Sequence, residues 1–408
     1  MPSCRTCHGH NLQCFLSLGR QPLANSFLSK EALAKPEPFY PLDVYFCSDC
    51  GLVQLVDVVS PEVLFRDYVY ASSSSNTRRQ HHARLAQEVF ERFLAGKDSL
   101  VVDIGSNDGC LLQGFRPLGV RTLGVEPATN IARLAEAAGI ETVNDFFSPA
   151  LAQRLKEAKG GAHAITLTNV FAHIDDLDSL LTGVRTLLAE RGVLVIEAPY
   201  LDDLLEGMLW DTIYHEHLSY FSVGPLIPLF RRFGMELFDV ERTPIDGGAI
   251  RIFAGRAGES PPPTQRVGEM LALEKAKGLS SLATFQRFAA RVQRSKEELR
   301  SLLGRLKAEG RRLAGYGAPA KGNTMLNYCQ IGPETLDYIV DGAPLKQGLF
   351  TPGTHIPVVP PARMREERPD YMLLLAWNFK DEIMGRERWF QESGGKFIMP
   401  VPQVEVVA

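Results

Sequence analysis

VVDIGSNDG, at residues 101–109, runs from an apolar stretch directly into a glycine-containing loop. Glycines let the backbone approach a ligand closely where a helix begins. The spacing of these glycines differs from the GxGxxG pattern of dinucleotide-binding loops. A second acidic residue, Glu126, ends the next expected strand 23 positions after Asp103, which is where doubly wound sheets bind a ribose diol. The stretch therefore predicts a nucleoside-containing ligand at the edge of a parallel sheet.

Expected strands and helices alternate around this loop. The expected strands of the first unit span 99–104, 121–126, 164–168 and 192–197, with helical patterns such as 130–138 and 177–190 between them. A second alternation gives strands at 313–316, 338–340, 371–376 and 396–399, with helices at 318–328 and from 381 onward. Strands that alternate with helices of this length form a parallel sheet covered on both faces. The sequence therefore predicts two α/β units.

Composition divides the chain further, into three predicted domains. The N-terminal part contains cysteines and prolines but few helical periods, and three prolines at 261–263 interrupt the pattern after the first α/β unit. We expect a small metal-binding domain at 1–75, an α/β domain at 76–263, and a helical segment followed by a second α/β domain at 264–408. The serine run at 72–75 is either a linker or a polar loop that lines a site.

The overall composition is that of a soluble globular protein. The 408 residues include 44 Lys+Arg and 48 Asp+Glu, which gives a net charge of −4, and the mean hydropathy is −0.07. A mildly acidic chain is not expected to bind nucleic acid in general. No apolar run is long enough to span a membrane, and the N-terminal residues lack the apolar core of a signal peptide. We expect a cytoplasmic protein, either monomer or homodimer, that does not bind membranes.

Two CxxC pairs predict a metal site in the N-terminal domain. The expected ligands are Cys4, Cys7, Cys47 and Cys50. Four thiolates are what a tetrahedral structural zinc site requires, and they leave no open position for a water molecule. Four unrelated cysteines are the alternative, and His8, His10 or Cys14 could replace a member of the set.

A dense group of proton carriers follows the fourth expected strand. The sequence YHEHLSYF, at 214–221, contains two imidazoles, a carboxylate and two phenols. Histidine suits base chemistry near neutral pH because its unperturbed pKa is about 6.5. His173 follows another strand directly, and ligands bind at the carboxyl ends of parallel strands. Both features predict a reactive site, although a structural histidine network, a solvated loop or a helix-capping histidine would also fit.

Two glycine-rich segments could contact an anionic substrate. GYGAPAKGNT, at 315–324, is a second strand–loop–helix element whose backbone N–H groups and Lys321 would suit a phosphate. DGGAIR, at 246–251, places flexible backbone beside Arg251. A simple tight turn is the alternative for the first segment.

The loop at 101–109 and Glu126 resemble those of class I S-adenosylmethionine-dependent methyltransferases. The resemblance implies that the loop around Gly105 faces the methionine part of the cofactor, that Glu126 binds the ribose hydroxyls, and that Asp145 and Phe146 lie near the adenine. Asp103 would support the loop or contact the amino group. The cofactor contacts expected from this resemblance are Asp103, Gly105, Asn107, Glu126, Asp145, Phe146 and Asn169. A different nucleotide on the same sheet is the alternative.

The order of the motifs along the whole chain resembles the nucleotide-sugar C-methyltransferases of deoxysugar biosynthesis, which include the tetronitrose and mycarose enzymes. The cysteine pairs, DIGSNDG, YHEHLSYF, DGGAIR and GYGAPAKGNTMLNY occur in that order. The resemblance implies an N-terminal zinc domain, a central class I methyltransferase domain, and a C-terminal Rossmann-like domain that helps to hold a sugar nucleotide.

This family implies C-methylation of a 4-keto sugar on a nucleoside diphosphate. His217 would be the base that generates the enolate, Glu216 would orient a neighbouring group, and Tyr214 would hydrogen-bond the substrate. His173 would hold or protonate the enolate oxygen. The expected substrate contacts are Tyr70, Arg251, Lys321 and Asn323. The alternatives are an O- or N-methyltransferase of another small metabolite and a zinc-containing adaptor that senses S-adenosylmethionine.

Overall fold

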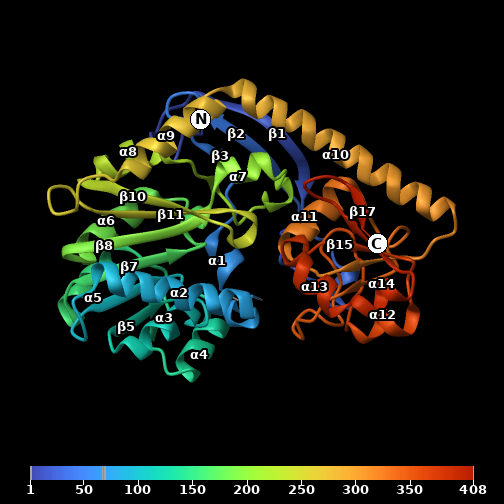
Figure 1. Cartoon of the computed structure of the whole chain (residues 1–408), viewed down its shortest axis with the longest axis horizontal. Coiled ribbons are helices and arrows are strands. Elements are labelled where there is room, and N and C mark those ends of the chain that lie inside the picture. The colour runs from blue at the N-terminus through green and yellow to red at the C-terminus, as the bar shows by residue number, and fades with distance from the viewer. Residues whose placement is uncertain (1, 67, 69, 408) are drawn as a thin grey trace.

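The computed structural model describes residues 2–66, 68 and 70–407 and contains three sheets (Figure 1). A small antiparallel sheet near the N-terminus is followed by two larger, mainly parallel sheets. The expected fold class is confirmed: an N-terminal cysteine-containing domain and two α/β units. No helix in the described part of the chain is both long enough and apolar enough to cross a membrane.

The N-terminal sheet takes its last strand from the central part of the chain. Its order is β1-β2-β3-β9, and all its pairs are antiparallel. The strands are β1 (Leu12–Gln21), β2 (Tyr40–Cys47), β3 (Val53–Leu55) and β9 (Ser219–Tyr220). Because Tyr220 pairs with Val53, the YHEHLSYF segment is attached to the N-terminal sheet.

The central sheet has seven strands in the order β10-β11-β8-β7-β4-β5-β6. Its parallel strands are β4 (Leu100–Ile104), β5 (Arg121–Val125), β6 (Thr142–Val143), β7 (Ala162–Thr168) and β8 (Leu188–Pro199). The antiparallel hairpin of β10 (Met235–Thr243) and β11 (Ala249–Arg256) extends the sheet beside β8. Neither this hairpin nor β6 is among the strands expected from the sequence.

Helices cover both faces of the central sheet because neighbouring side chains on a buried parallel strand point to opposite sides. On β4, Val102 belongs to one apolar cluster, with α5 (Pro149–Lys159) and α6 (Leu177–Leu187). Val101 belongs to another, with α2 (Asn76–Phe93) and α3 (Cys110–Phe115). The helices of this part of the chain are α1 (Pro61–Phe65), α2 (Asn76–Phe93), α3 (Cys110–Phe115), α4 (Thr129–Ala137), α5 (Pro149–Lys159), α6 (Leu177–Leu187), α7 (Leu201–Glu206) and α8 (Val223–Arg232).

The C-terminal sheet has the order β14-β13-β12-β15-β16-β17, with only β17 antiparallel. Its strands are β12 (Leu313–Tyr316), β13 (Ile339–Val340), β14 (Val358–Val359), β15 (Tyr371–Leu374), β16 (Lys396–Met399) and β17 (Glu405–Val407). Its helices are α11 (Ala320–Cys329), α12 (Ala362–Glu367), α13 (Lys380–Arg386) and α14 (Arg388–Glu392). The strand order reverses between the neighbouring strands β12 and β15, because β13 and β14 are added on one side and β15 and β16 on the other. Open α/β sheets bind ligands at such a point.

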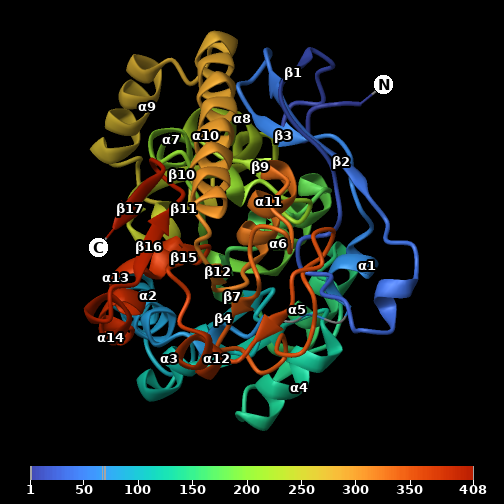
Figure 2. The same ribbon diagram turned by 90° about the vertical axis from the view of Figure 1, so that its right-hand side faces the viewer.

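A helical pair joins the two α/β units. The pair consists of α9 (Gln265–Lys277) and α10 (Leu282–Ala308). Buried Phe285, Phe288 and Val292 recur at helical spacing on α10, and the ring of Phe285 contacts those of Phe15 and Phe46. Helix α10 thus lies along the N-terminal sheet and reaches the C-terminal unit (Figures 1 and 2).

The apolar core does not follow the predicted domain boundaries. One continuous cluster contains Leu42 of the N-terminal sheet, Leu204 of α7 and Leu373 of the C-terminal sheet. The N-terminal and C-terminal units are therefore packed together rather than connected by a linker alone. The boundaries at 75/76 and 263/264 remain predictions.

Candidate active site

A cleft of about 1390 Å³ receives the carboxyl ends of strands from both parallel sheets. The lining residues within two positions of strand ends include Gly105, Thr168 and Pro199 of the central sheet and Tyr316, Asp341 and Ala376 of the C-terminal sheet. The N-terminal part also contributes to the wall, through Asn25 and Phe65. Such sheet edges are where α/β proteins bind ligands, and here two of them face the same space.

The glycine loop after β4 forms one wall of the cleft. Gly105 has φ +68°, and a Cβ atom there would lie 2.5 Å from a methyl group of Val170. Position 105 therefore needs glycine for both its backbone conformation and its close packing. Asp103, beneath the loop, is buried and accepts a 2.6 Å hydrogen bond from the hydroxyl of Thr166. Burial raises the pKa of Asp103 to about 7.

Glu126 is positioned at the end of β5 by backbone donors. Its carboxylate accepts hydrogen bonds of 2.8 Å from the backbone N–H groups of Asn107 and Ala128. Burial raises the pKa of Glu126. Because the side chain still lines the cleft, a fixed acceptor is available where a ribose diol is expected.

The remaining expected cofactor residues differ in whether they line the cleft. Asn107, Phe146 and Asn169 line the cleft, whereas Asp145 does not. The carboxylate of Asp145 instead accepts a 2.8 Å hydrogen bond from the backbone N–H of Phe146. The side chain of Asp145 thus supports the turn that presents Phe146 to the cleft, and the expected place of both residues near the adenine stays a prediction.

The serine run is a polar loop on the site rather than a linker. The backbone N–H of Ser72 donates to Oδ1 of Asn107 at 2.8 Å, and Nδ2 of Asn107 donates to the carbonyl of Tyr70 at 3.1 Å. Ser72 and Tyr70 both line the cleft. Tyr70, expected to contact the substrate, therefore lies against the glycine loop, on the side of the cleft where the cofactor is expected.

His217 is a partly buried, uncharged imidazole with both nitrogens engaged. Its Nδ1 lies 2.7 Å from the carbonyl oxygen of Thr212, which can only accept a hydrogen bond, so Nδ1 carries the proton. Nε2 then accepts from the hydroxyl of Tyr214 at 2.9 Å. Burial lowers the pKa of His217 to about 4. Both His217 and Tyr214 line the cleft, which places a neutral base beside a phenol donor.

His173 lies next to His217 and is held by an aromatic stack. Its ring centroid is 5.2 Å from that of His217. It is 5.5 Å from that of Phe65, and the planes of the His173 and Phe65 rings are within 5° of parallel. Burial lowers the pKa of His173 well below its usual value. His173 also lines the cleft and can offer a neutral N–H group to a developing negative charge.

Glu216 lies behind the cleft wall. Its carboxylate accepts hydrogen bonds from the hydroxyl of Tyr68 at 2.8 Å and from the amide of Asn25 at 2.6 Å. Tyr68 and Asn25 line the cleft, whereas Glu216 does not. Glu216 therefore holds two residues of the cleft wall, and its expected orienting role stays a prediction. Nothing in the sequence pairs these residues, because 148 and 191 positions separate them from Glu216.

Lys321 is a partly buried cation on the C-terminal side of the cleft. Its Nζ donates to the amide oxygen of Asn378 at 2.6 Å and lies 3.6 Å from the centre of the Trp377 ring. Burial lowers the pKa of Lys321 to about 8. Lys321 and Asn378 line the cleft. A second buried lysine there, Lys346, donates to the carbonyl of Ala318 at 2.7 Å.

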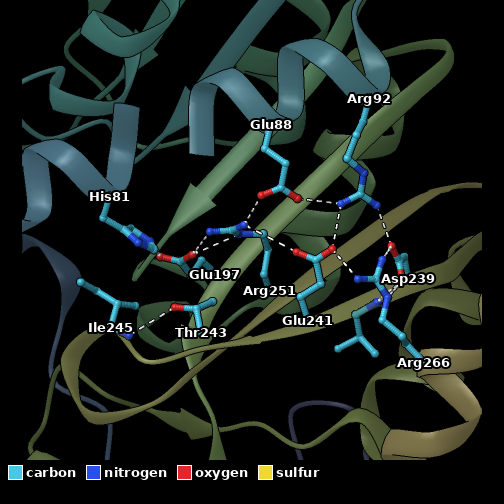
Figure 3. Close-up of polar contacts among 11 residues, drawn as sticks. His81, Glu88, Arg92, Glu197, Asp239, Glu241, Thr243, Ile245, Arg251 and Arg266 are labelled. Carbon is cyan, nitrogen blue, oxygen red and sulfur yellow. Dashed lines mark hydrogen bonds and ion pairs between the residues drawn. The ribbon is translucent and has the colours of Figure 1, made fainter. Parts of the chain in front are cut away.

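Arg251 and Asn323 do not take the positions expected of substrate contacts, since neither lines the cleft. Arg251 is buried on β11, where its guanidinium pairs with Glu197 at 2.9 Å and with Glu88 at 2.6 Å (Figure 3). The amide of Asn323 donates to the carbonyl of Ala24 at 2.7 Å and joins α11 to the N-terminal unit. Spacing in the sequence cannot distinguish a free cation from one that nearby carboxylates neutralise.

The four expected metal ligands converge in the N-terminal domain. The Sγ atoms of Cys4, Cys7, Cys47 and Cys50 all lie within 4.8 Å of one another. Individual separations are 3.5 Å between Cys4 and Cys50 and 3.7 Å between Cys7 and Cys47. Zn–S bonds of about 2.3 Å in a tetrahedron separate the sulfur atoms by about 3.8 Å. The cluster therefore fits a structural zinc ion, which would join the N-terminal loop to the end of β2.

Comparison with known proteins agrees with this architecture. Family models match residues 4–65 as a zinc binding domain, 77–240 as a methyltransferase domain and 244–402 as a C-methyltransferase C-terminal domain. The fold and the cleft thus define an S-adenosylmethionine-dependent methyltransferase. The chain is 39% identical to the C-methyltransferase NovU of Streptomyces niveus over 405 residues, which is 99% of this chain and 96% of the relative. It belongs to the C-methyltransferase family.

Solved structures resemble only part of the chain. The magnesium protoporphyrin IX methyltransferase of Synechocystis, solved with bound S-adenosylmethionine, is 13% identical and has a TM-score of 0.34, covering 45% of this chain and 82% of its own. The glycopeptide N-methyltransferase MtfA, also with the cofactor, is 12% identical with a TM-score of 0.34, covering 43% and 87%. Both likenesses are too weak to bear on the substrate.

Proposed function

We propose that this C-methyltransferase methylates a carbon next to the ketone of a 4-keto deoxysugar carried on a nucleoside diphosphate, by way of an enolate. The observation that carries the proposal is the neutral His217–Tyr214 pair, which lines the same cleft as the glycine loop and the C-terminal sheet. A carbon acid needs a base to become a nucleophile, and this pair supplies one.

The C-terminal side of the cleft has the features of a nucleotide site. Asp341 follows β13 directly, and its Oδ2 accepts a 2.6 Å hydrogen bond from the backbone N–H of Ala318 in the loop after β12. An acidic residue at the end of the second strand is typical of ribose binding in such sheets. Lys321, in the first turn of α11, and Lys346 provide positive charge for a diphosphate. These features support a nucleoside diphosphate as the carrier.

The proposed proton transfer uses the groups around His217. Nε2 of His217 accepts the proton from the sugar carbon, either directly or through the hydroxyl of Tyr214, while Thr212 fixes Nδ1–H and therefore the tautomer. His173 donates an N–H hydrogen bond to the enolate oxygen, which makes the carbon easier to deprotonate. S-adenosylmethionine supplies the electrophilic sulfonium methyl group. In this proposal the cleft would hold both ligands side by side, and positioning would then provide much of the rate acceleration.

The decisive experiment is mass spectrometry of reactions in deuterated water with a panel of nucleotide-linked 4-keto sugars. The proposal predicts one methyl gained on carbon, and exchange of solvent deuterium at that same carbon in the absence of S-adenosylmethionine. A methyl group recovered as an ether or an amine would instead indicate O- or N-methylation. No transfer to any 4-keto sugar, with cofactor binding intact, would refute the substrate class.

A further inference from the structure

Arg78, on the first turn of α2, holds a buried positive charge at the cofactor side of the cleft. Its side chain is 11% exposed, and its guanidinium donates to the carboxylate of Asp246. The same guanidinium lies 5.9 Å from the centre of the Tyr70 ring. Arg78, Asp246 and Tyr70 all line the cleft. The pair is therefore a neutral but strongly polar wall, because each charge compensates the other.

This pair lies beside the glycine loop. The carbonyl of Tyr70 accepts a hydrogen bond from Asn107 in that loop, and Tyr70 in turn lies under Arg78. Among the described lining residues of the methyltransferase half, 76–263, Arg78 and Arg79 are the only arginines or lysines, and Arg79 is exposed. Arg78 is thus the one largely buried cation that this half offers to an anionic group.

His82, one turn further along α2, is a polar residue of the same part of the cleft that lacks a hydrogen-bond partner among the described residues. Its side chain is buried, and neither ring nitrogen has a hydrogen-bond partner within the described part of the chain. It nevertheless lines the cleft. Burial lowers the pKa of His82 to about 4, so the neutral ring can donate one hydrogen bond. Buried polar groups are rarely left unpaired in native proteins, and a bound ligand would satisfy this one.

We infer that Arg78 and Asp246 recognise the amino acid end of S-adenosylmethionine, with Arg78 and His82 facing its carboxylate and Asp246 its ammonium group. A guanidinium matches a carboxylate in two parallel hydrogen bonds. The ligand has one negative and one positive group, as the Arg78–Asp246 pair does. Arg78 would therefore face the carboxylate and Asp246 the ammonium group, and no charge would be left buried without a partner. The inference concerns cofactor recognition and is independent of the sugar proposed above.

Calorimetric binding of three ligands that lose the charged groups of this end stepwise tests the inference; the smallest of them is a thioether and also lacks the sulfonium charge. S-adenosylmethionine has both charges, its decarboxylated analogue has only the ammonium group, and 5′-methylthioadenosine has neither. We expect the wild-type protein to bind the decarboxylated analogue at least about 10-fold more weakly than the cofactor. Arg78→Met removes a charge-assisted hydrogen bond, so its affinity for S-adenosylmethionine should fall by about 10- to 100-fold. Its affinity for the decarboxylated analogue should stay within about twofold of the wild-type value.

Asp246→Asn completes the comparison. It should lower the affinity for both ligands that carry the ammonium group and leave the affinity for 5′-methylthioadenosine unchanged. Arg84→Met, an exposed arginine of the same helix outside the cleft, is the matched control and should change none of the three affinities.

Two results would overturn the inference. One is equal wild-type affinity for the cofactor and its decarboxylated analogue. The other is a loss in Arg78→Met that is the same for all three ligands, which would mean that Arg78 only supports the fold. If Arg78→Met does not fold, Arg78→Lys keeps the charge without the planar fork and should lose part of the discrimination, while the wild-type comparison stands on its own.

Discussion

The hydroxyl of Tyr214 lies 2.9 Å from Nε2 of His217, and the other nitrogen of the same imidazole is bound to the carbonyl of Thr212. This arrangement fixes one tautomer and leaves the basic nitrogen directed at an exchangeable proton. Because burial lowers the pKa of His217 to about 4, the ring is uncharged at neutral pH. The imidazole is therefore in its basic form before any substrate binds.

Replacement of His217 by Asn should greatly reduce methyl transfer. Loss of one proton carrier typically costs about 10²- to 10⁴-fold in rate, and we expect the fall in kcat within that range. Calorimetry should show unchanged affinity for S-adenosylmethionine, which separates a catalytic defect from a folding defect. Turnover comparable to that of the wild-type protein would remove His217 from the proposed mechanism.

Lys321→Met should raise KM for the sugar nucleotide more than it lowers kcat, because the lysine is proposed to bind rather than react. The pKa of about 8 further predicts that substrate affinity declines as the pH rises through 8, where the cation is lost. Lys396→Met, an exposed lysine on β16 outside the cleft, is the matched control. A selective loss of kcat would assign Lys321 to the chemistry instead.

Arg251→Met should destabilise the protein rather than alter substrate affinity. Its removal leaves Glu197, which is fully buried, without its guanidinium partner (Figure 3), and breaking a buried pair typically costs about 3–5 kcal/mol. His81 also contacts Glu197, at 2.7 Å, and can compensate part of this cost. Chemical denaturation measures the effect. Arg266→Met, in the half-exposed end of the same network, should cost less.

An unchanged denaturation midpoint in Arg251→Met, combined with a raised KM for the sugar nucleotide, would contradict the placement of Arg251 in a structural network.

Acid should weaken the folded state through its buried histidines. The pKa of His82 and of His217 is about 4 in the folded protein, against about 6.5 in the unfolded chain. Between these values the unfolded state binds more protons, so the free energy of unfolding falls as the pH drops from about 6.5 to about 4. Each histidine can contribute up to about 3 kcal/mol over that range.

Urea denaturation at several pH values checks this slope. His82→Gln should flatten it, whereas His10→Gln, which changes an exposed histidine, should not. A slope that His82→Gln leaves unchanged would mean that His82 is not the titrating group.

Removal of zinc should loosen the N-terminal sheet first. The metal would join the segment before β1 to the end of β2 and the turn after it. Structural zinc sites contribute directly to folding. We expect a strong chelator, or Cys47→Ser, to lower the denaturation midpoint and release about one zinc per chain. Because β9 pairs with β3, methyl transfer should fall as well. Full stability after verified metal loss would contradict a structural role.

The sequence alone determined the local elements of this protein. The expected strand 313–316 coincides with β12, and the expected strand 396–399 with β16, because a buried parallel strand is a short apolar run between turn residues. The glycine loop, Glu126 and the two CxxC pairs were recognisable for a similar reason. Their chemistry depends on residue type and short spacing, both of which can be read from one chain.

Only the tertiary structure decided which side chains face the cleft. In the sequence, Arg251 and Lys321 are both cations within glycine-containing segments. In the structure, carboxylates on other elements neutralise Arg251, whereas Lys321 lines the cleft. The contact between Tyr68 and Glu216, and the pairing of Arg78 with Asp246, likewise join residues 148 and 168 positions apart. Whether a charge is paired depends on which strands and helices pack together, and that packing is set by the burial of apolar surface across the whole chain.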